Sequence, residues 1–89
     1  MTQLAPQDHV VFTEFDGTEG ILVDLNTKKY YQLNETATLI WKGLGLGLGI
    51  NDIADQIVAA YEITPSDARR NVDATLEKLI SYNLVARHQ

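Results

Sequence analysis

The feature that most constrains the fold is a change of period within KKYYQLNETATLIW, residues 28–41. The aromatic run at residues 30–33 favours a short, half-buried strand. Asn34 is a good helix N-cap, because its side-chain oxygen can accept a hydrogen bond from a free N–H of the first turn. Apolar residues then recur at helical spacing, at Ala37, Ile40, Trp41 and Leu44. A strand is therefore expected to lead into a helix with almost no loop.

Two further strands are predicted before this corner, at residues 9–15 and 21–25. The segment DGTEG at 16–20 separates them and has the glycines of a tight turn. A second turn, at 26–29, leads to the aromatic strand. Because strands that are close in sequence usually pair, we expect an antiparallel meander whose third strand lies at an edge. The polar residues 1–8 are expected to form a loose arm.

The first helix is expected from Glu35 to about Leu44, where the repeat GLGLGLG at 43–49 begins. Each glycine costs about 1 kcal/mol in a helix interior, so the helix should stop within the repeat. No Lys-Ser/Thr pair follows these glycines, and a helix rather than a strand precedes them. The repeat therefore predicts neither a P-loop nor a dinucleotide site, but a helix stop with leucines that reach the core.

Two more helices follow. The apolar period from Ile50 to Tyr61 predicts the second helix. Thr64 as N-cap, with Pro65 after it and Asp67 closing a capping box, predicts the start of the third helix. Its apolar stripe comprises Ala68, Val72, Leu76, Leu79 and Ile80. Asn83 is the predicted C-cap, and residues 84–85 are expected to form a short strand or to dock on the core.

These elements predict one α+β domain over residues 1–89, in which a three-stranded antiparallel sheet precedes three helices. The hydrophobic fraction of 45% is that of a globular chain, and 89 residues suffice for one small core. The predicted core consists of Leu33, Ile40, Trp41, Ile57, Val72, Leu76 and Leu79.

Composition excludes several classes of function. The chain has no cysteine, which excludes disulfides and thiolate metal sites. No apolar run approaches the length of about 18 residues that a membrane span needs, and the first residues do not have the pattern of a signal peptide. We therefore expect a cytoplasmic protein that does not bind membranes. The net charge of −5 also opposes binding to nucleic acid.

No pattern predicts an enzyme, a metal site or a cofactor site. The two histidines, His9 and His88, have no partner at metal-ligand spacing. The serines of the third helix have no paired base in the sequence. Asp16 and Glu19 share a turn, but they supply too few oxygens for a calcium loop. The helix carboxylates are interpreted as solvated; they are Asp52, Asp55, Asp67, Asp73 and Glu77.

The segment GILVDLNTKKYYQLNETATLIW, residues 20–41, resembles the core of the PqqD-like family of recognition elements for ribosomally made precursor peptides. The similarity rests on Leu22, Val23, Asp24, residues 26–29, Tyr30, Tyr31, Leu33, Asn34, Ala37, Ile40 and Trp41. It extends over nearly the whole chain, because the later helices fit the family's order and length. The repeat at 43–49 departs from the charged, glycine-containing turn of the family.

The resemblance implies a winged helix-turn-helix variant and a non-catalytic function. Such a module binds the leader of a precursor peptide and presents it to a maturation enzyme. In the family that enzyme is a radical SAM enzyme, as in pyrroloquinoline quinone biosynthesis, or a lasso-type leader protease. Residues 22–41 look more like the general and lasso-type members than like the quinone carrier.

An open edge at Lys29–Leu33 would allow an extended peptide to add as a fourth strand. Tyr31 shares its face with Leu33 and is expected toward the core, whereas Tyr30 shares its face with Gln32 and is expected to be exposed. The third helix should form the other wall of a groove. The predicted contact residues are Lys29, Tyr30, Tyr31, Gln32, Leu33, Arg69, Val72, Asp73 and Leu76. The same edge also predicts pairing of two copies into a homodimer.

A winged-helix DNA-binding protein is the alternative hypothesis. Its third helix would enter the major groove, where Arg69 and Arg70 would contact phosphates or bases. The acidic residues Asp67, Asp73 and Glu77 of the same helix oppose this function, as does the net charge.

Overall fold

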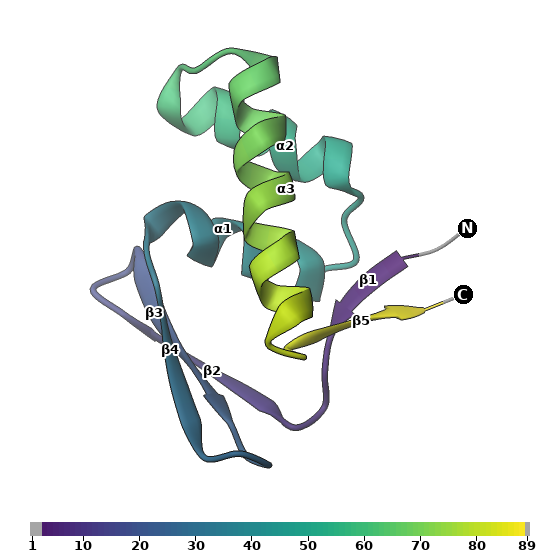
Figure 1. Cartoon of the computed structure of the whole chain (residues 1–89). Coiled ribbons are helices and arrows are strands. Elements are labelled where there is room, and N and C mark those ends of the chain that lie inside the picture. The colour runs from purple at the N-terminus through teal and green to yellow at the C-terminus, as the bar shows by residue number, and fades with distance from the viewer. Residues whose placement is uncertain (1–2, 89) are drawn as a thin grey trace.

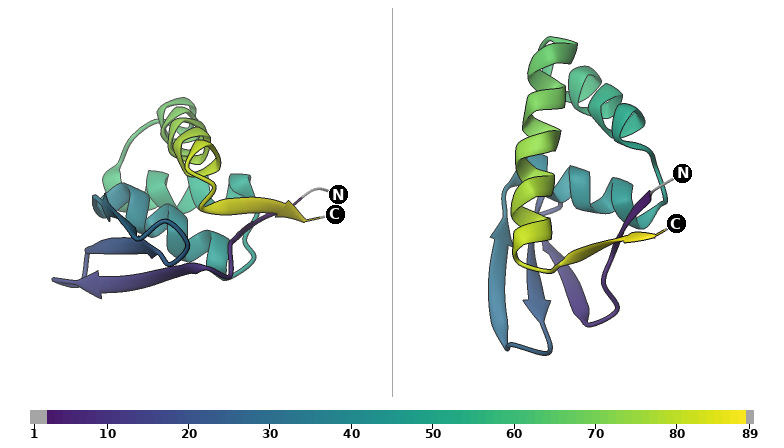
Figure 2. Two further views of the ribbon diagram at one scale, coloured as in Figure 1. Left: turned by 60° about the horizontal axis from the view of Figure 1, so that its bottom comes forward. Right: turned by 45° about the vertical axis from the view of Figure 1, so that its right-hand side comes forward.

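The computed structural model describes residues 3–88, and side chains for residues 4–86. Within this range the elements in chain order are β1 (Gln3–Pro6), β2 (Val10–Phe15), β3 (Glu19–Asp24), β4 (Lys29–Leu33), α1 (Glu35–Gly45), α2 (Ile50–Tyr61), α3 (Pro65–Ser81) and β5 (Val85–His88). Strands β2, β3 and β4 form an antiparallel meander in that order, and the helices pack on one side of it (Figures 1 and 2). The predicted α+β fold, a three-stranded sheet with three helices, is confirmed.

The central strand β3 sets the register of this sheet. Leu22 pairs with Phe12 of β2 on one side and with Tyr31 of β4 on the other. Leu22 is completely buried, so this row of side chains faces the helices. All seven residues predicted for the core are buried, together with further apolar residues from α1, α2, α3 and the start of β5.

The corner between β4 and α1 has the predicted N-cap. The Asn34 Oδ1 atom accepts a hydrogen bond from the backbone N–H of Ala37 at 2.8 Å. The Thr38 hydroxyl donates to the backbone carbonyl of Leu33 at 3.4 Å, which joins the helix to the last residue of the strand. These bonds satisfy backbone groups that a strand end and a helix start would otherwise leave unpaired.

The glycine repeat ends α1 and brings it close to α2. The helix stops at Gly45, and Gly47 has a φ of 80°, a conformation that favours glycine. A Cβ atom on Gly43 would lie 2.7 Å from the Ile53 side chain, so only glycine allows this packing distance. The expectation that the leucines of the repeat reach the core is wrong for Leu46, whose side chain is 77% exposed.

The third helix begins at the predicted N-cap, Thr64, and its C-cap lies one residue earlier than predicted. The Thr64 hydroxyl accepts a hydrogen bond from the N–H of Asp67 at 3.1 Å, and Pro65 follows the cap. At the other end the C-cap is Tyr82, not Asn83, which lies just beyond it with a φ of 61°. This left-handed residue turns the chain, and the N–H of Leu84 bonds to the Leu79 carbonyl at 2.9 Å. The buried Leu84 then leads into β5.

The expectation of a loose arm at residues 1–8 is wrong for the part of the arm that the structure describes. Strand β1 pairs antiparallel with β5, from Gln3 opposite His88 to Pro6 opposite Val85. The N–H of Gln7 extends the pairing to the carbonyl of Leu84 at 3.0 Å. The arm is ordered because β5 offers it a backbone partner and the core offers Leu4 a packing site. Residues 1–2 lie outside the described residues.

Candidate functional site

Strand β4 is an edge of the three-stranded sheet, as predicted. Within residues 3–88 its backbone pairs with β3 on one side, and no strand pairs with its other side. A groove of about 410 Å³ runs along β4. Its lining residues from the strand and the corner are Tyr30, Tyr31, Gln32, Leu33, Asn34 and Ala37, and those from α3 and the turn after it are Thr75, Lys78, Leu79, Tyr82 and Leu84. Helix α3 is therefore the opposite wall.

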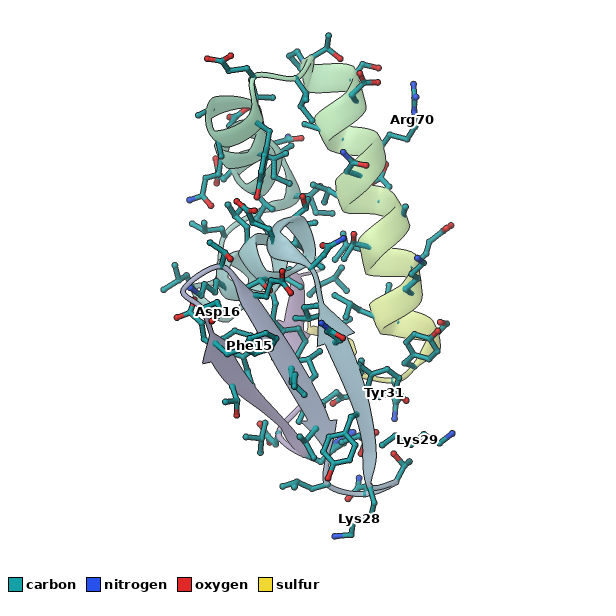
Figure 3. The ribbon with its side chains drawn as sticks, turned by 90° about the vertical axis from the view of Figure 1, so that its left-hand side faces the viewer. Phe15, Asp16, Lys28, Lys29, Tyr31 and Arg70 are labelled. Atoms are coloured by element: carbon teal, nitrogen blue, oxygen red, sulfur yellow. The ribbon has the colours of Figure 1, made fainter. Side chains whose placement is uncertain are left out.

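The two faces of β4 differ as the alternation predicted. The Tyr30 side chain is 75% exposed, whereas Leu33 is buried and Tyr31 is half-buried. Tyr31 points toward the C-terminal end of α3 (Figure 3). There its ring packs against the ring of Tyr82, with the centroids 4.8 Å apart and an angle of 32° between the ring planes. The groove thus has an aromatic pair at this end and the apolar Leu33 and Leu79 farther along.

The four predicted residues of the helix do not line this groove. Val72 and Leu76 are buried in the core and are not among the residues that line the groove. Arg69 donates to Asp73 at 3.2 Å and to Asn51 of α2 at 2.8 Å, which directs it toward α2. The apolar stripe of α3 was identified correctly as a core surface. It does not predict which adjacent face lies beside β4.

The helix residues that line the groove were not predicted from the sequence, but they have a regular helical spacing. Thr75, Lys78, Leu79 and Tyr82 follow one another at intervals of three, one and three residues, on the last turns of the helix and at its C-cap. Residues three and four apart share a helix face, so these side chains form a continuous surface. In the sequence, a leucine that follows a lysine and precedes a tyrosine by three residues does not by itself predict a groove wall. Only the antiparallel course of α3 along β4 identifies it.

The hairpin turn that positions β4 is fixed by a buried carboxylate. Asp24 is 2% exposed, and its Oδ1 atom accepts from the N–H groups of Asn26 at 2.9 Å and Thr27 at 3.2 Å. The Nε2 atom of His9 lies 3.8 Å from the same oxygen. Burial raises the pKa of Asp24, but the hydrogen bonds from Thr27 and Asn26 and the charge of His9 outweigh burial, so this pKa lies below its ordinary value. The ionised form therefore supports the turn before β4.

The arginines of α3 are paired with acids. Arg70 lies 3.5 Å from Asp67, and Arg69 bonds to Asp73. The positive charge that a DNA-reading helix would present is thus partly neutralised on the same helix. This pairing opposes the DNA-binding alternative.

The described residues contain no group of three or more His, Asp or Glu side chains that could hold a metal ion. No helix among them has the length and hydropathy needed to cross a bilayer. The site therefore consists of an open strand edge, a groove with apolar and aromatic walls, and the polar atoms of Gln32, Asn34, Thr75 and Lys78.

Two solved structures resemble this chain over most of its length. One is TbiB1 in complex with the TbiA(beta) leader peptide, which is 28% identical, with a TM-score of 0.85 over 91% of this chain and 93% of that chain. The other is a lasso peptide synthetase B1 complexed with the leader peptide, which is 26% identical, with a TM-score of 0.86 over 94% of this chain and 98% of that chain. No curated protein sequence gave a significant match.

The family comparison covers most of the fold described above. The model for coenzyme PQQ synthesis protein D matches residues 19–85, from the start of β3 to the start of β5. This range includes the open edge β4 and the whole of α3, and so both walls of the groove. The chain belongs to the PqqD family.

Proposed function

We propose that this protein is a non-catalytic recognition module that binds the leader segment of a ribosomally made precursor peptide. The leader adds along β4 as a fourth antiparallel or parallel strand, and its alternate side chains enter the groove against α3. The protein then presents the leader to a maturation enzyme. The observation that carries the proposal is the open edge of β4, which runs beside a groove with an apolar and aromatic lining.

Backbone pairing and side-chain contacts have separate roles in this proposal. The unpaired N–H and C=O groups of β4 bind any extended peptide, because a strand's backbone is the same for every sequence. Selectivity comes from the groove side chains, chiefly Tyr31, Leu79 and Tyr82. The two similar structures, each described as a complex with a leader peptide, support this ligand class.

We also propose that the pathway is of the lasso type rather than the quinone type. The support is the similarity to a lasso peptide synthetase B1 at 26% identity over nearly the whole of both chains. The partner enzyme is then a leader protease. Genes beside the coding sequence test this assignment. A transglutaminase-like protease gene and a short precursor gene are expected, whereas a radical SAM enzyme gene would contradict it.

Binding is tested with the leader encoded by that precursor gene, labelled with a fluorophore, and with a labelled DNA duplex in a parallel titration. We expect the peptide to bind and its affinity to survive moderate salt. The DNA should bind weakly, and any DNA binding should fall steeply with salt. DNA binding that is tight and steeply salt-dependent, with no peptide binding, would overturn the proposal.

A further inference from the structure

The lysines and arginines whose side chains are described divide into two groups, one with acidic partners and one without. Lys42 pairs with Glu14, Arg69 with Asp73 and Arg70 with Asp67. The remaining cations with described side chains are Lys28, Lys29 and Lys78. Within the described part of the chain, no carboxylate oxygen lies within 4.0 Å of these three ammonium groups.

The three unpaired lysines lie in the groove or next to it in the chain. Lys78 lines the groove from α3. Lys28 and Lys29 lie at the turn where β4 begins, below Tyr31 in Figure 3, whereas Arg70 lies at the far end of α3. The aromatic pair ties the two walls together here, because Tyr31 belongs to β4 and Tyr82 follows the last turn of α3. Positive charge therefore gathers beside the open edge.

The carboxylates nearest in sequence do not neutralise this charge. Asp24 is the register partner of Lys29, but its oxygen accepts from the N–H groups of the turn instead. Glu77 precedes Lys78, and side chains one residue apart on a helix do not face each other. The lysines are exposed and available to a ligand.

We propose that the peptide bound along β4 carries acidic side chains where it passes Lys28, Lys29 and Lys78. This inference rests on the proposed function, because it describes the ligand of the same groove. The chain as a whole has a net charge of −5 and repels acidic peptides, so an acidic ligand is attracted only where cations are concentrated and unpaired. Charge complementarity of this kind sets partner choice and the speed of association more than total affinity.

The alternation of side chains along β4 predicts a sequence pattern in the bound peptide. Lys29, Tyr31 and Leu33 share the inner face of the strand, because side chains alternate. On an added strand, the residues beside Lys29 and Leu33 are then four positions apart. The first meets the lysines, and the second meets the apolar surface of Leu33 and Leu79. The ligand should therefore have an acidic residue and an apolar residue at positions i and i+4, in the order set by strand direction.

A display library of random 12-residue peptides, selected on the purified protein, tests this pattern and does not require the natural leader. We expect the selected peptides to be enriched in Asp or Glu four positions from an apolar residue. The same selection on Lys29→Glu/Lys78→Glu should lose this enrichment and favour Lys or Arg at the acidic position. The control Arg69→Glu/Arg70→Glu changes net charge equally at the other end of α3 and should keep the acidic preference.

One selected peptide is then synthesised and titrated by fluorescence anisotropy. Each lysine replaced by glutamate should weaken binding by about twofold to fivefold, and the effect should shrink with added salt. Peptides that bind along β4 without an acidic preference, or an acidic preference that survives the lysine replacements, would overturn the inference and leave the proposed function intact. If the native protein selects no peptide, both the inference and the proposed function fail.

Discussion

Tyr31 and Tyr82 stack across the groove with ring centroids 4.8 Å apart. Tyr31 belongs to the inner face of β4, and Tyr82 caps α3. The contact therefore connects the sheet edge to the end of the helix and fixes the width of the groove at this point. Aromatic pairs of this kind contribute about 0.5–1.5 kcal/mol beyond the area they bury.

We expect Tyr82→Ala to lower the free energy of unfolding by about 1 kcal/mol, because it removes the ring contact at a half-exposed position. A double-mutant cycle with Tyr31→Ala should give a coupling energy of about 0.5–1.5 kcal/mol. Urea unfolding followed by the fluorescence of Trp41, the one tryptophan of the sequence, measures both quantities. Tyr30→Ala on the exposed face serves as the control. Strictly additive effects of the Tyr31 and Tyr82 substitutions would show that the stack is not stabilising.

Proline within β4 should weaken peptide binding. Successive residues of a strand direct their N–H groups to opposite sides. Of the two substitutions Tyr31→Pro and Gln32→Pro, one therefore removes an N–H donor that faces β3, and the other removes a donor that faces the open edge. We expect a loss of affinity of about twofold to tenfold, since one net hydrogen bond contributes about 0.5–1.5 kcal/mol. Thr13→Pro in β2, at the opposite edge, is the matched control. Equal losses of affinity in all three variants would argue against binding along β4.

Sequence reasoning succeeded where local patterns decide the structure. Asn34 and Thr64 were predicted as helix N-caps because each has a side-chain oxygen and comes just before apolar residues at helical spacing, and the structure confirms both. The edge position of β4 followed from short connections between strands. Arg69 and Asp73 were expected beside β4 but do not line the groove. Helical spacing predicts which stripe of a helix is buried, but not which element lies beside each flank of that stripe. The strand at Gln3–Pro6 was missed because its partner, β5, is far away in the sequence.

The two glycines Gly43 and Gly45 should respond in opposite ways to alanine. In Gly43→Ala the new methyl group meets the buried Ile53 side chain at 2.7 Å, so we expect a loss of about 1–3 kcal/mol in stability. Nothing lies within 4 Å of a Cβ atom on Gly45, and Gly45→Ala should gain up to about 1 kcal/mol from helix propensity. Thermal unfolding of the two variants tests the contrast. Similar melting temperatures would mean that α1 and α2 do not pack this closely.

Asp24 should make the free energy of unfolding depend on pH in the acidic range. Its pKa is lowered in the folded state, so it stabilises the fold above its unfolded pKa of about 3.9, and this contribution disappears as pH falls through the lowered value. Asp24→Asn cannot ionise. We expect this variant to be less stable than the native protein at pH 7 and the difference to shrink below about pH 4. Asp55→Asn, at an exposed site of α2, is the control. A stability difference that is independent of pH would contradict this account.

The open edge should also allow two copies to pair. An exposed strand presents unpaired N–H and C=O groups to another chain. We expect light scattering to show a dimer that increases with protein concentration and dissociates when leader peptide is added, since both use β4. A strict monomer at high micromolar concentration would remove this idea, whereas a dimer unaffected by the peptide would place the contact elsewhere.

The pairing of β1 with β5 has a consequence for the order of folding during synthesis. Residues 3–6 are synthesised before the three-stranded sheet and the three helices, whereas their strand partners at 85–88 are synthesised after them. The meander β2–β4 uses only neighbouring segments and can pair at once, because short loops close at little entropic cost. During synthesis β1 therefore stays unpaired and the core stays incomplete until Leu84 and Val85 have been made. These two residues then fill the core, and the strand that follows pairs with β1.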